Sequence, residues 1–242
     1  MKTIIHIGQH KTGTTSIQKF LQSNKDLCAE NGLYIPSRIA GYEDNSHFIL
    51  NVYALDENRY SSKKEDIVAS KGTAYMRGLK LELQRDIERT YKDAAGKGCT
   101  KVIWSNEGLY LLNSKREYER LVNLFSEYST EVEVVCCFRD KDSYRQSYTE
   151  QLKKGKRSES NDPDSYRYLK QDSWLFDYDR KKTLLSSTFD KHTYFLYDAT
   201  DNVGRFMESI GITIKGGEEY RENVTTSKRD NLRQRIRTRL AF

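Results

Sequence analysis

The first strand and helix of the chain constrain its fold more than any other feature. Residues Thr3 to Gly8 form a short apolar run that predicts a buried strand, and Thr14 opens a stretch with helical spacing of apolar residues. Only a short loop that ends at Gly13 separates the two. A buried strand that passes directly into a helix is typical of an α/β protein with a parallel sheet.

The rest of the sequence repeats this alternation of strand and helix. Apolar and β-branched runs predict strands at 101–105, 132–138 and 193–197. Apolar spacing predicts helices at 73–95, 115–128, 142–154, 165–173, 179–189 and 201–210. We therefore expect an α/β fold, a P-loop-like three-layer sandwich with a central, mostly parallel sheet flanked by helices.

We expect residues 1–242 to form a single domain. The segments near 36–72 and 155–175 have no sustained hydrophobic period, which predicts largely irregular structure beside the substrate, with room for short helices in 36–72, and the segment 223–242 is basic. Hydrophobic residues make up 36% of the chain, which is polar but sufficient for a core in a chain of this length. The composition therefore excludes disorder of the whole chain.

The charge and the cysteines bound the class of protein further. The net charge of +6 suits an anionic ligand but is too small to indicate a nucleic-acid-binding protein. No apolar run approaches 18 residues and no signal peptide is recognisable, so we expect a cytoplasmic protein. The four cysteines show no CxxC spacing and are expected to be reduced, partly buried thiols.

The loop between the first strand and the first helix has the G-x-x-x-x-G spacing of phosphate-binding loops. Gly8 and Gly13 frame it, and the amides of the loop and of the helix start converge on an anion. In the Walker pattern a lysine follows the second glycine, and the next Ser or Thr holds Mg²⁺. Here Thr14 occupies the lysine position and Lys11 lies inside the loop. The loop predicts phosphate binding without the metal-assisted geometry of an ATPase.

A second anion-binding motif follows the strand at 132–138. Arg139 closes this strand, and Ser147 lies eight residues later, roughly two helical turns away. An arginine offers a bidentate fork to a phosphate, and a serine offers a hydroxyl donor. The spacing lets both side chains reach one ligand group.

Together the two motifs resemble those of the sulfotransferases that use 3′-phosphoadenosine-5′-phosphosulfate (PAPS), in their carbohydrate and bacterial branch. The resemblance implies PAPS as donor, 3′-phosphoadenosine-5′-phosphate (PAP) as product, and no metal requirement. It assigns the 3′-phosphate to Arg139 and Ser147, although Lys141 stands where the family usually has proline. It assigns the 5′-phosphosulfate to the loop residues His10, Lys11, Thr12, Gly13, Thr14, Thr15 and Ser16.

Sulfuryl transfer to a hydroxyl needs a cation at the leaving phosphate and a base at the acceptor. Lys11 is expected to meet the phosphosulfate bridge. Glu107, just past the strand at 101–105, is the expected base, because related carbohydrate sulfotransferases carry a glutamate in this region. His47, in the irregular segment, is the rival base, and His10 is a third candidate.

The resemblance implies that the sulfuryl group moves from PAPS to a hydroxyl acceptor by in-line displacement. A sugar, glycolipid or polysaccharide is the expected acceptor, with peripheral membrane contact if the acceptor is membrane-bound, and no nucleic-acid partner is expected. Two alternatives stay open. One is a P-loop-type nucleotide-dependent kinase, and the other is a non-catalytic nucleotide-binding protein on the same fold.

Overall fold

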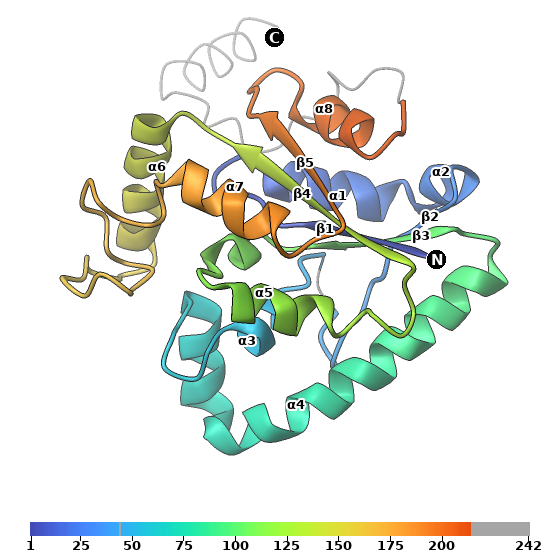
Figure 1. Ribbon diagram of the computed structural model, residues 1–242, viewed down its shortest axis with the longest axis horizontal. Helices are drawn as coiled ribbons and strands as arrows, with labels where there is room; N and C mark the ends of the chain where they lie inside the picture. The colour runs from blue at the N-terminus through green and yellow to red at the C-terminus, as the bar shows by residue number, and fades with distance from the viewer. Residues whose placement is uncertain (44, 214–242) are drawn as a thin grey trace, which may run out of the picture.

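A parallel five-stranded sheet lies at the centre of the chain, which this computed structural model describes over residues 1–43 and 45–213 (Figure 1). In sheet order the strands are β2 (Leu33–Tyr34), β3 (Lys101–Ser105), β1 (Lys2–His6), β4 (Glu131–Phe138) and β5 (Lys191–Leu196). All four neighbouring pairs are parallel, which confirms the predicted fold class. The carboxyl ends of β1, β3 and β4 therefore meet at one edge of the sheet.

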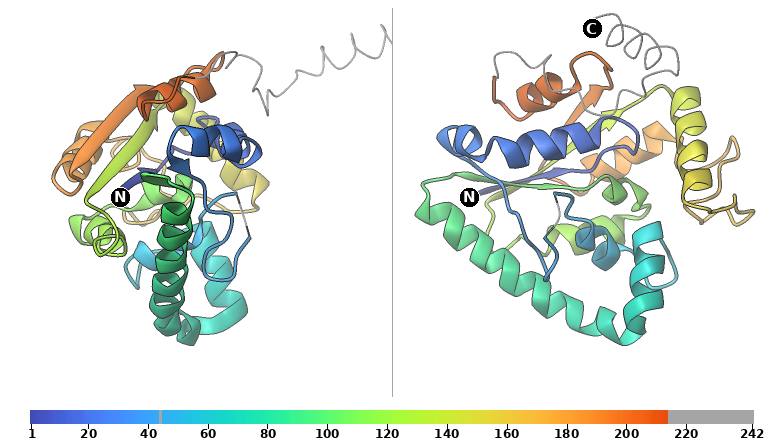
Figure 2. Two further views of the ribbon diagram at one scale, coloured as in Figure 1. Left: turned by 90° about the vertical axis from the view of Figure 1, so that its right-hand side faces the viewer. Right: turned by 180° about the vertical axis from the view of Figure 1, so that it is seen from behind.

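Helices cover both faces of the sheet and give three layers (Figures 1 and 2). One face carries α1 (Thr14–Ser23), α2 (Lys25–Glu30) and α8 (Asn202–Ser209). The other face carries α3 (Ile49–Ala54), α4 (Ser62–Gly96), the short 3₁₀ helix η1 (Glu107–Leu111), α5 (Lys115–Val122), α6 (Lys141–Lys154) and α7 (Tyr178–Ser186).

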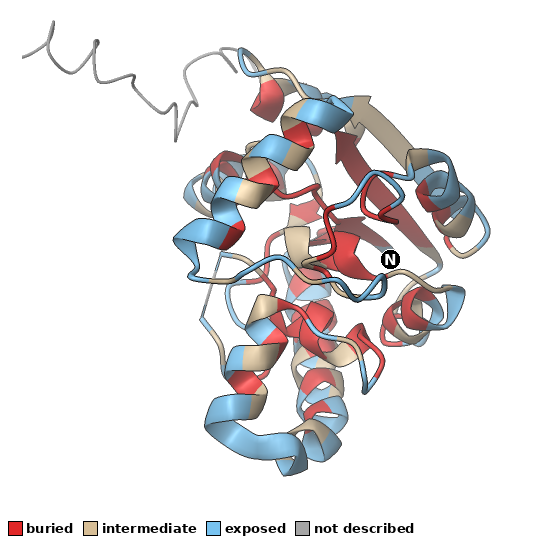
Figure 3. Cartoon of the chain, turned by 90° about the vertical axis from the view of Figure 1, so that its left-hand side faces the viewer, coloured by how far each residue is buried: buried red, intermediate tan, exposed pale blue. Residues whose placement is uncertain are grey.

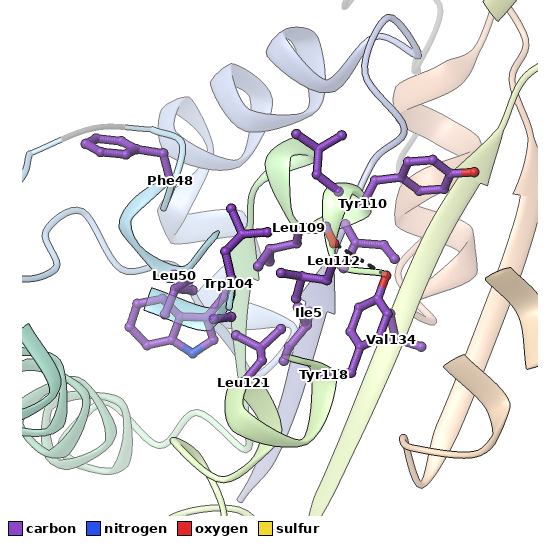
Figure 4. Packing of buried hydrophobic residues seen from close by; sticks show 14 of the residues in the cluster. Ile5, Phe48, Leu50, Trp104, Leu109, Tyr110, Leu112, Tyr118, Leu121 and Val134 are labelled. Carbon is purple, nitrogen blue, oxygen red and sulfur yellow. Dashed lines mark hydrogen bonds between the residues drawn. The ribbon is translucent and has the colours of Figure 1, made fainter. Parts of the chain in front are cut away.

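Strands β1, β3 and β4 are largely buried on both faces because successive side chains alternate between the two helical layers, whereas the edge strand β5 is partly exposed. Ile4 packs in the cluster with α1 and α8, whereas Ile5 packs in the larger cluster around Trp104 (Figure 4). The adjacent Cys136 and Cys137 point to opposite faces of the sheet, as neighbouring residues of a strand should. Cys136 lies in the larger cluster, and Sγ of Cys137 lies 3.7 Å from Oδ1 of Asn202 in α8. Figure 3 shows buried strands at the centre of the sheet, an edge strand of intermediate burial, and helices whose outer sides are exposed.

Helix α4 begins earlier than the sequence pattern predicts. Residues 62–72, expected to be largely irregular with short helices at most, form its first turns, which Ser61 caps by accepting from the amide of Lys64. The chain kinks at Gly72 (φ 73°, ψ 170°) and continues as the predicted helix. A capping serine and the helix-compatible residues after it override the missing hydrophobic period.

The predicted helix at 165–173 is wrong, because this stretch forms turns. Polar side chains compete with the helical pattern here. The side chain of Asp162 accepts from the amide of Asp164, and that of Ser165 accepts from the amide of Arg167. The expectation of an irregular segment over 155–175 describes this part of the chain better.

The sequence pattern did not predict strand β2, because two residues are too few to show a hydrophobic period. The basic segment 223–242 lies outside the described residues. Within the part that is described, we find no helix with the length and apolar character needed to cross a membrane.

Candidate active site

The loop after β1 has the backbone conformation of an anion cradle. Gly8, Lys11 and Gly13 have φ angles of 82°, 64° and 69°. A side chain at Gly8 would place its Cβ 2.8 Å from Cβ of Glu107, and one at Gly13 would place it 2.9 Å from Nδ2 of Asn202. Both glycines are needed for their conformation and for these close approaches. The loop is thus held between η1 and α8.

The amino end of α1 opens onto this loop. Its N-cap is Gly13, whose carbonyl accepts from the amides of Ser16 and Ile17 at 3.0 and 3.1 Å. None of the described side chains caps the helix, so no side-chain cap covers its start. The helix dipole adds a partial positive charge, and the exposed Lys11 side chain adds a full one. The cradle therefore fits a phosphate or sulfate group.

The three threonines of the loop and helix start differ in burial and in hydrogen bonding. The Thr12 hydroxyl donates to the carbonyl of Gln9 at 2.7 Å, and the Thr12 carbonyl accepts from Nδ2 of Asn202 at 2.6 Å. Thr14 is buried and Thr15 is exposed. Thr12 therefore shapes the loop.

Gln9 joins three elements at the carboxyl edge of the sheet, and the sequence motifs did not reveal it. The side chain is fully buried. Its Nε2 donates to the hydroxyl of Tyr110 at 2.9 Å, and its Oε1 accepts from the amide of Arg139 at 2.9 Å. The Tyr110 hydroxyl in turn donates to the carbonyl of Leu175 at 3.1 Å. Gln9 thus fixes the loop relative to η1 and to the end of β4.

Arg139 lies directly against the loop. Its Nη1 donates to the carbonyl of Lys11 at 2.9 Å, and its Nε donates to Oγ of Ser143 at 2.6 Å. The guanidinium also lies over the ring of Tyr197, 5.1 Å from its centroid. On the opposite side, Tyr178 of α7 donates to the carbonyl of Arg139 at 2.7 Å. The two cations expected to hold the nucleotide therefore lie on adjoining segments.

Ser147 lies on α6, two turns beyond Arg139, and its side chain is half-buried. It is Ser143, one turn earlier, that contacts the arginine. The ring of Tyr148, next to Ser147, packs 5.3 Å from that of His10 in the loop. The face of α6 that carries Tyr148 therefore borders the cradle.

Glu107 is the first residue of η1 and follows directly from β3. Its backbone abuts Gly8, as described above. Its Oε2 accepts from Nε2 of Gln18 in α1 at 3.0 Å. The residue predicted from its place after the strand is thus next to the phosphate-binding loop.

His10 lies between these charges. Burial lowers its pKa below the usual value, the Glu107 carboxylate opposes this shift, and Lys11 adds to it. The Nδ1 atom is buried and has no hydrogen-bond partner among the described residues. The lowered pKa favours the neutral imidazole, and the packing of the ring against Tyr148 favours a role in shaping the cradle.

The far end of η1 is fixed by two cations. Nζ of Lys181 donates to the carbonyls of Tyr110 and Leu112 at 3.0 and 2.5 Å, and Nη2 of Arg59 donates to that of Leu111 at 3.0 Å. Lys181 is fully buried, which lowers its pKa to about 7. Cations suit the carbonyls at a helix end. The short helix that starts with Glu107 is therefore held at both ends.

His47 has both ring nitrogens engaged with the backbone. Its Nδ1 accepts from the amide of Ser105 at 2.9 Å, which leaves the proton on Nε2 facing the carbonyl of Pro36 at 3.2 Å. The ring is buried and packs edge-on against Trp104, with centroids 5.0 Å apart. An imidazole bonded in this way has no lone pair for a substrate proton. The geometry argues against His47 as the base.

Acid should weaken the fold through His6, which is fully buried on β1. Burial lowers its pKa from 6.5 to about 3, so below pH 6.5 the unfolded chain binds a proton that the folded chain excludes. Stability should therefore fall as the pH drops from 6.5 towards 3, by about 2 kcal/mol between pH 7 and pH 5 from this group. Urea unfolding of His6→Gln at both pH values checks this. A pH dependence equal to that of the unmodified protein would contradict the assignment.

The described chain has two notable cavities. One, of about 440 Å³, lies beside Arg139 and is lined by aromatic and basic side chains that include Phe138, Tyr178 and Lys182. The other, of about 490 Å³, is a polar cleft that includes Tyr60 and Arg167. The cleft brings together the two segments that the sequence predicted to form the acceptor side.

The fold resembles that of a solved bacterial sulfotransferase. Over its whole length the chain superposes on 93% of a sulfotransferase from Alicyclobacillus acidocaldarius, with a TM-score of 0.53 and 14% identical residues. It also superposes on the sulfotransferase domain from the curacin biosynthetic pathway, with a TM-score of 0.47 and 10% identity over 94% of this chain and 80% of that one. No protein-family model matches the chain, and no curated protein matches it in sequence.

The likeness to the Alicyclobacillus enzyme establishes a shared fold at low sequence identity. A fold can carry many activities, so the function has to be argued from the site itself.

Proposed function

We propose that the protein transfers the sulfuryl group of PAPS to a hydroxyl acceptor. The observation that carries this proposal is the contact of three elements at one edge of the sheet. Glu107 abuts Gly8, and Arg139 donates to the carbonyl of Lys11. A base candidate, a loop cation and a second phosphate-binding cation are thereby held together, as sulfuryl transfer from a nucleotide requires.

The residues of the cradle fit the two anionic ends of PAPS. The uncapped start of α1 and the exposed Lys11 suit the 5′-phosphosulfate. Arg139 and Ser147 would hold the 3′-phosphate, Arg139 through a charge-assisted fork. His10, Thr12, Gly13, Thr14, Thr15 and Ser16 complete the loop that would surround the phosphosulfate.

PAPS, when bound, supplies a sulfuryl group already activated by its bond to phosphate. Glu107 would take the proton of the acceptor hydroxyl as the oxygen attacks sulfur, which is worth about 10² to 10⁴ in rate. Lys11 would neutralise the charge that develops on the leaving phosphate. None of these roles needs a metal ion, since the charges are met by the chain's own cations.

A nucleotide-dependent kinase is the weaker alternative. Thr14 stands where the Walker lysine belongs, and Lys11 projects from within the loop. A non-catalytic nucleotide-binding protein would not need a carboxylate fixed against the loop, yet Glu107 is held there by Gly8 and Gln18. Both features favour the sulfotransferase.

We propose a sugar or glycoconjugate as the acceptor, bound in the polar cleft between the segments 56–65 and 160–167. The polar cleft is lined by four arginines and four acidic residues together with amides and hydroxyls. Several of these charges are already paired, as in the bond of Arg116 to Asp56 at 2.7 Å. A charge-balanced polar cleft favours a hydroxyl-rich ligand over an apolar phenol or a polyanion.

The variant Arg139→Ala tests whether Arg139 binds the 3′-phosphate. We expect it to weaken PAP binding about tenfold, because it removes a charge-assisted bond, and Ser147→Ala to weaken it less. Isothermal titration with PAP and with adenosine 5′-phosphate, which lacks the 3′-phosphate, checks this. Equal weakening for both ligands would remove Arg139 from the 3′-phosphate site.

The proposal as a whole can be tested by ligand-induced stabilisation. A ligand that binds only the folded state raises the melting temperature. PAP without metal should do so, and ATP with Mg²⁺ should not. Stabilisation by ATP and Mg²⁺ alone would favour the kinase.

A further inference from the structure

The carboxylate of Glu107 is held by one neutral side chain. Nε2 of Gln18 donates to Oε2 of Glu107 at 3.0 Å, and among the described residues none donates to Oε1. Gln18 is only 6% exposed, although it carries a polar amide on α1. A buried amide is retained where its hydrogen bonds matter, since burying it without partners is costly.

Gln18 is itself anchored to the end of β3. Its Nε2 lies 3.4 Å from Oγ of Ser105, and this hydroxyl lies 2.8 Å from Nδ1 of His6. The backbone of Ser105 is fixed in turn by His47. A row of polar groups inside the fold therefore ends at Glu107, and Gln18 is the member that touches it.

We propose that Gln18 is a positioning residue that orients the Glu107 carboxylate for proton transfer. The inference rests on the proposed function, in which Glu107 is the base. With Oε2 occupied by the amide, Oε1 is the oxygen that accepts the hydroxyl proton. The acceptor oxygen then forms its bond to sulfur, and the sulfur–oxygen bond to phosphate breaks with its electron pair leaving on PAP.

The first experiment compares two glutamines of the same helix. Gln18→Met removes the donor while keeping length and helix propensity. Gln22→Met is the matched control, because Gln22 lies one turn further along α1 and, among the described residues, its side chain bonds only the carbonyl of Pro36, at 2.9 Å. PAP release from saturating PAPS, with water as the acceptor, should slow about tenfold in Gln18→Met and stay unchanged in the control. Both variants should bind PAP normally.

The second experiment asks whether Gln18 acts through Glu107. In a Glu107→Gln background, Gln18→Met should cause no further slowing, because there is no carboxylate left to orient. A merely structural role would slow both backgrounds equally, and that result would overturn the inference. Loss of PAP affinity in parallel with rate, or equal slowing in Gln22→Met, would also overturn it.

Thermal unfolding of each variant checks that it is folded. If Gln18→Met does not fold, Gln18→Leu replaces it, because leucine also removes the donor. Failure of the proposed function gives a different pattern. The unmodified protein would then release no PAP from PAPS with water or with any hydroxyl acceptor, or Glu107→Gln would be as fast as the unmodified protein. Either result removes the base and the positioning role together.

Discussion

Glu107→Gln is expected to bind PAP as tightly as the unmodified protein and to turn over PAPS at least about 100-fold more slowly. The amide keeps the shape of the side chain but cannot accept a proton. Binding should survive because the cradle is built from the loop and the start of α1, and the substitution leaves Gly8 in contact with the same backbone. Single-turnover measurements at saturating PAPS isolate the chemical step.

The contrast for Glu107→Gln is His47→Gln. Both ring nitrogens of His47 bond the backbone, so this variant should lose stability while keeping its single-turnover rate per folded molecule. The opposite pattern, with a slow His47→Gln and an unimpaired Glu107→Gln, would show that His47 and not Glu107 is the general base.

Lys11→Ala is expected to leave the fold intact and to lower the rate at least tenfold, towards the 10² to 10³ that removal of one preorganised charge-stabilising group typically costs. The side chain is exposed and so packs little. Its charge matters most when the leaving phosphate gains charge, so the loss should fall on the chemical step more than on PAP binding.

The control for Lys11→Ala is Lys19→Ala, which removes the same charge from an exposed position on α1. Near-normal single-turnover rates in folded Lys11→Ala would exclude the lysine from the mechanism. Equal slowing in both variants would show a general effect of net charge.

The sequence predicted those parts of the fold and candidate site that depend on local pattern. The strand before Gly8, the helix after Gly13 and the strand that ends at Arg139 all lie where apolar runs and turn residues indicate. The helix at 165–173 failed because short-range bonds from Asp162 and Ser165 outweigh its spacing.

The parts of the site that the sequence did not predict depend on long-range contacts. Gln9 and Gln18 look like ordinary polar residues, and only the fold brings them to Arg139 and Glu107. The choice between Glu107 and His47 stayed open for the same reason. The bonds of the imidazole to Pro36 and Ser105 join segments that no spacing rule connects.

One measurement tests the central claim most directly. The purified protein is incubated in parallel with PAPS without metal and with ATP and Mg²⁺, and the nucleotide products are quantified with and without a panel of oligosaccharides and glycolipids. The account predicts release of PAP from PAPS, faster when a suitable hydroxyl acceptor is present, and no ADP from ATP. Release of ADP without PAP, or no turnover of either nucleotide with any acceptor, would contradict it.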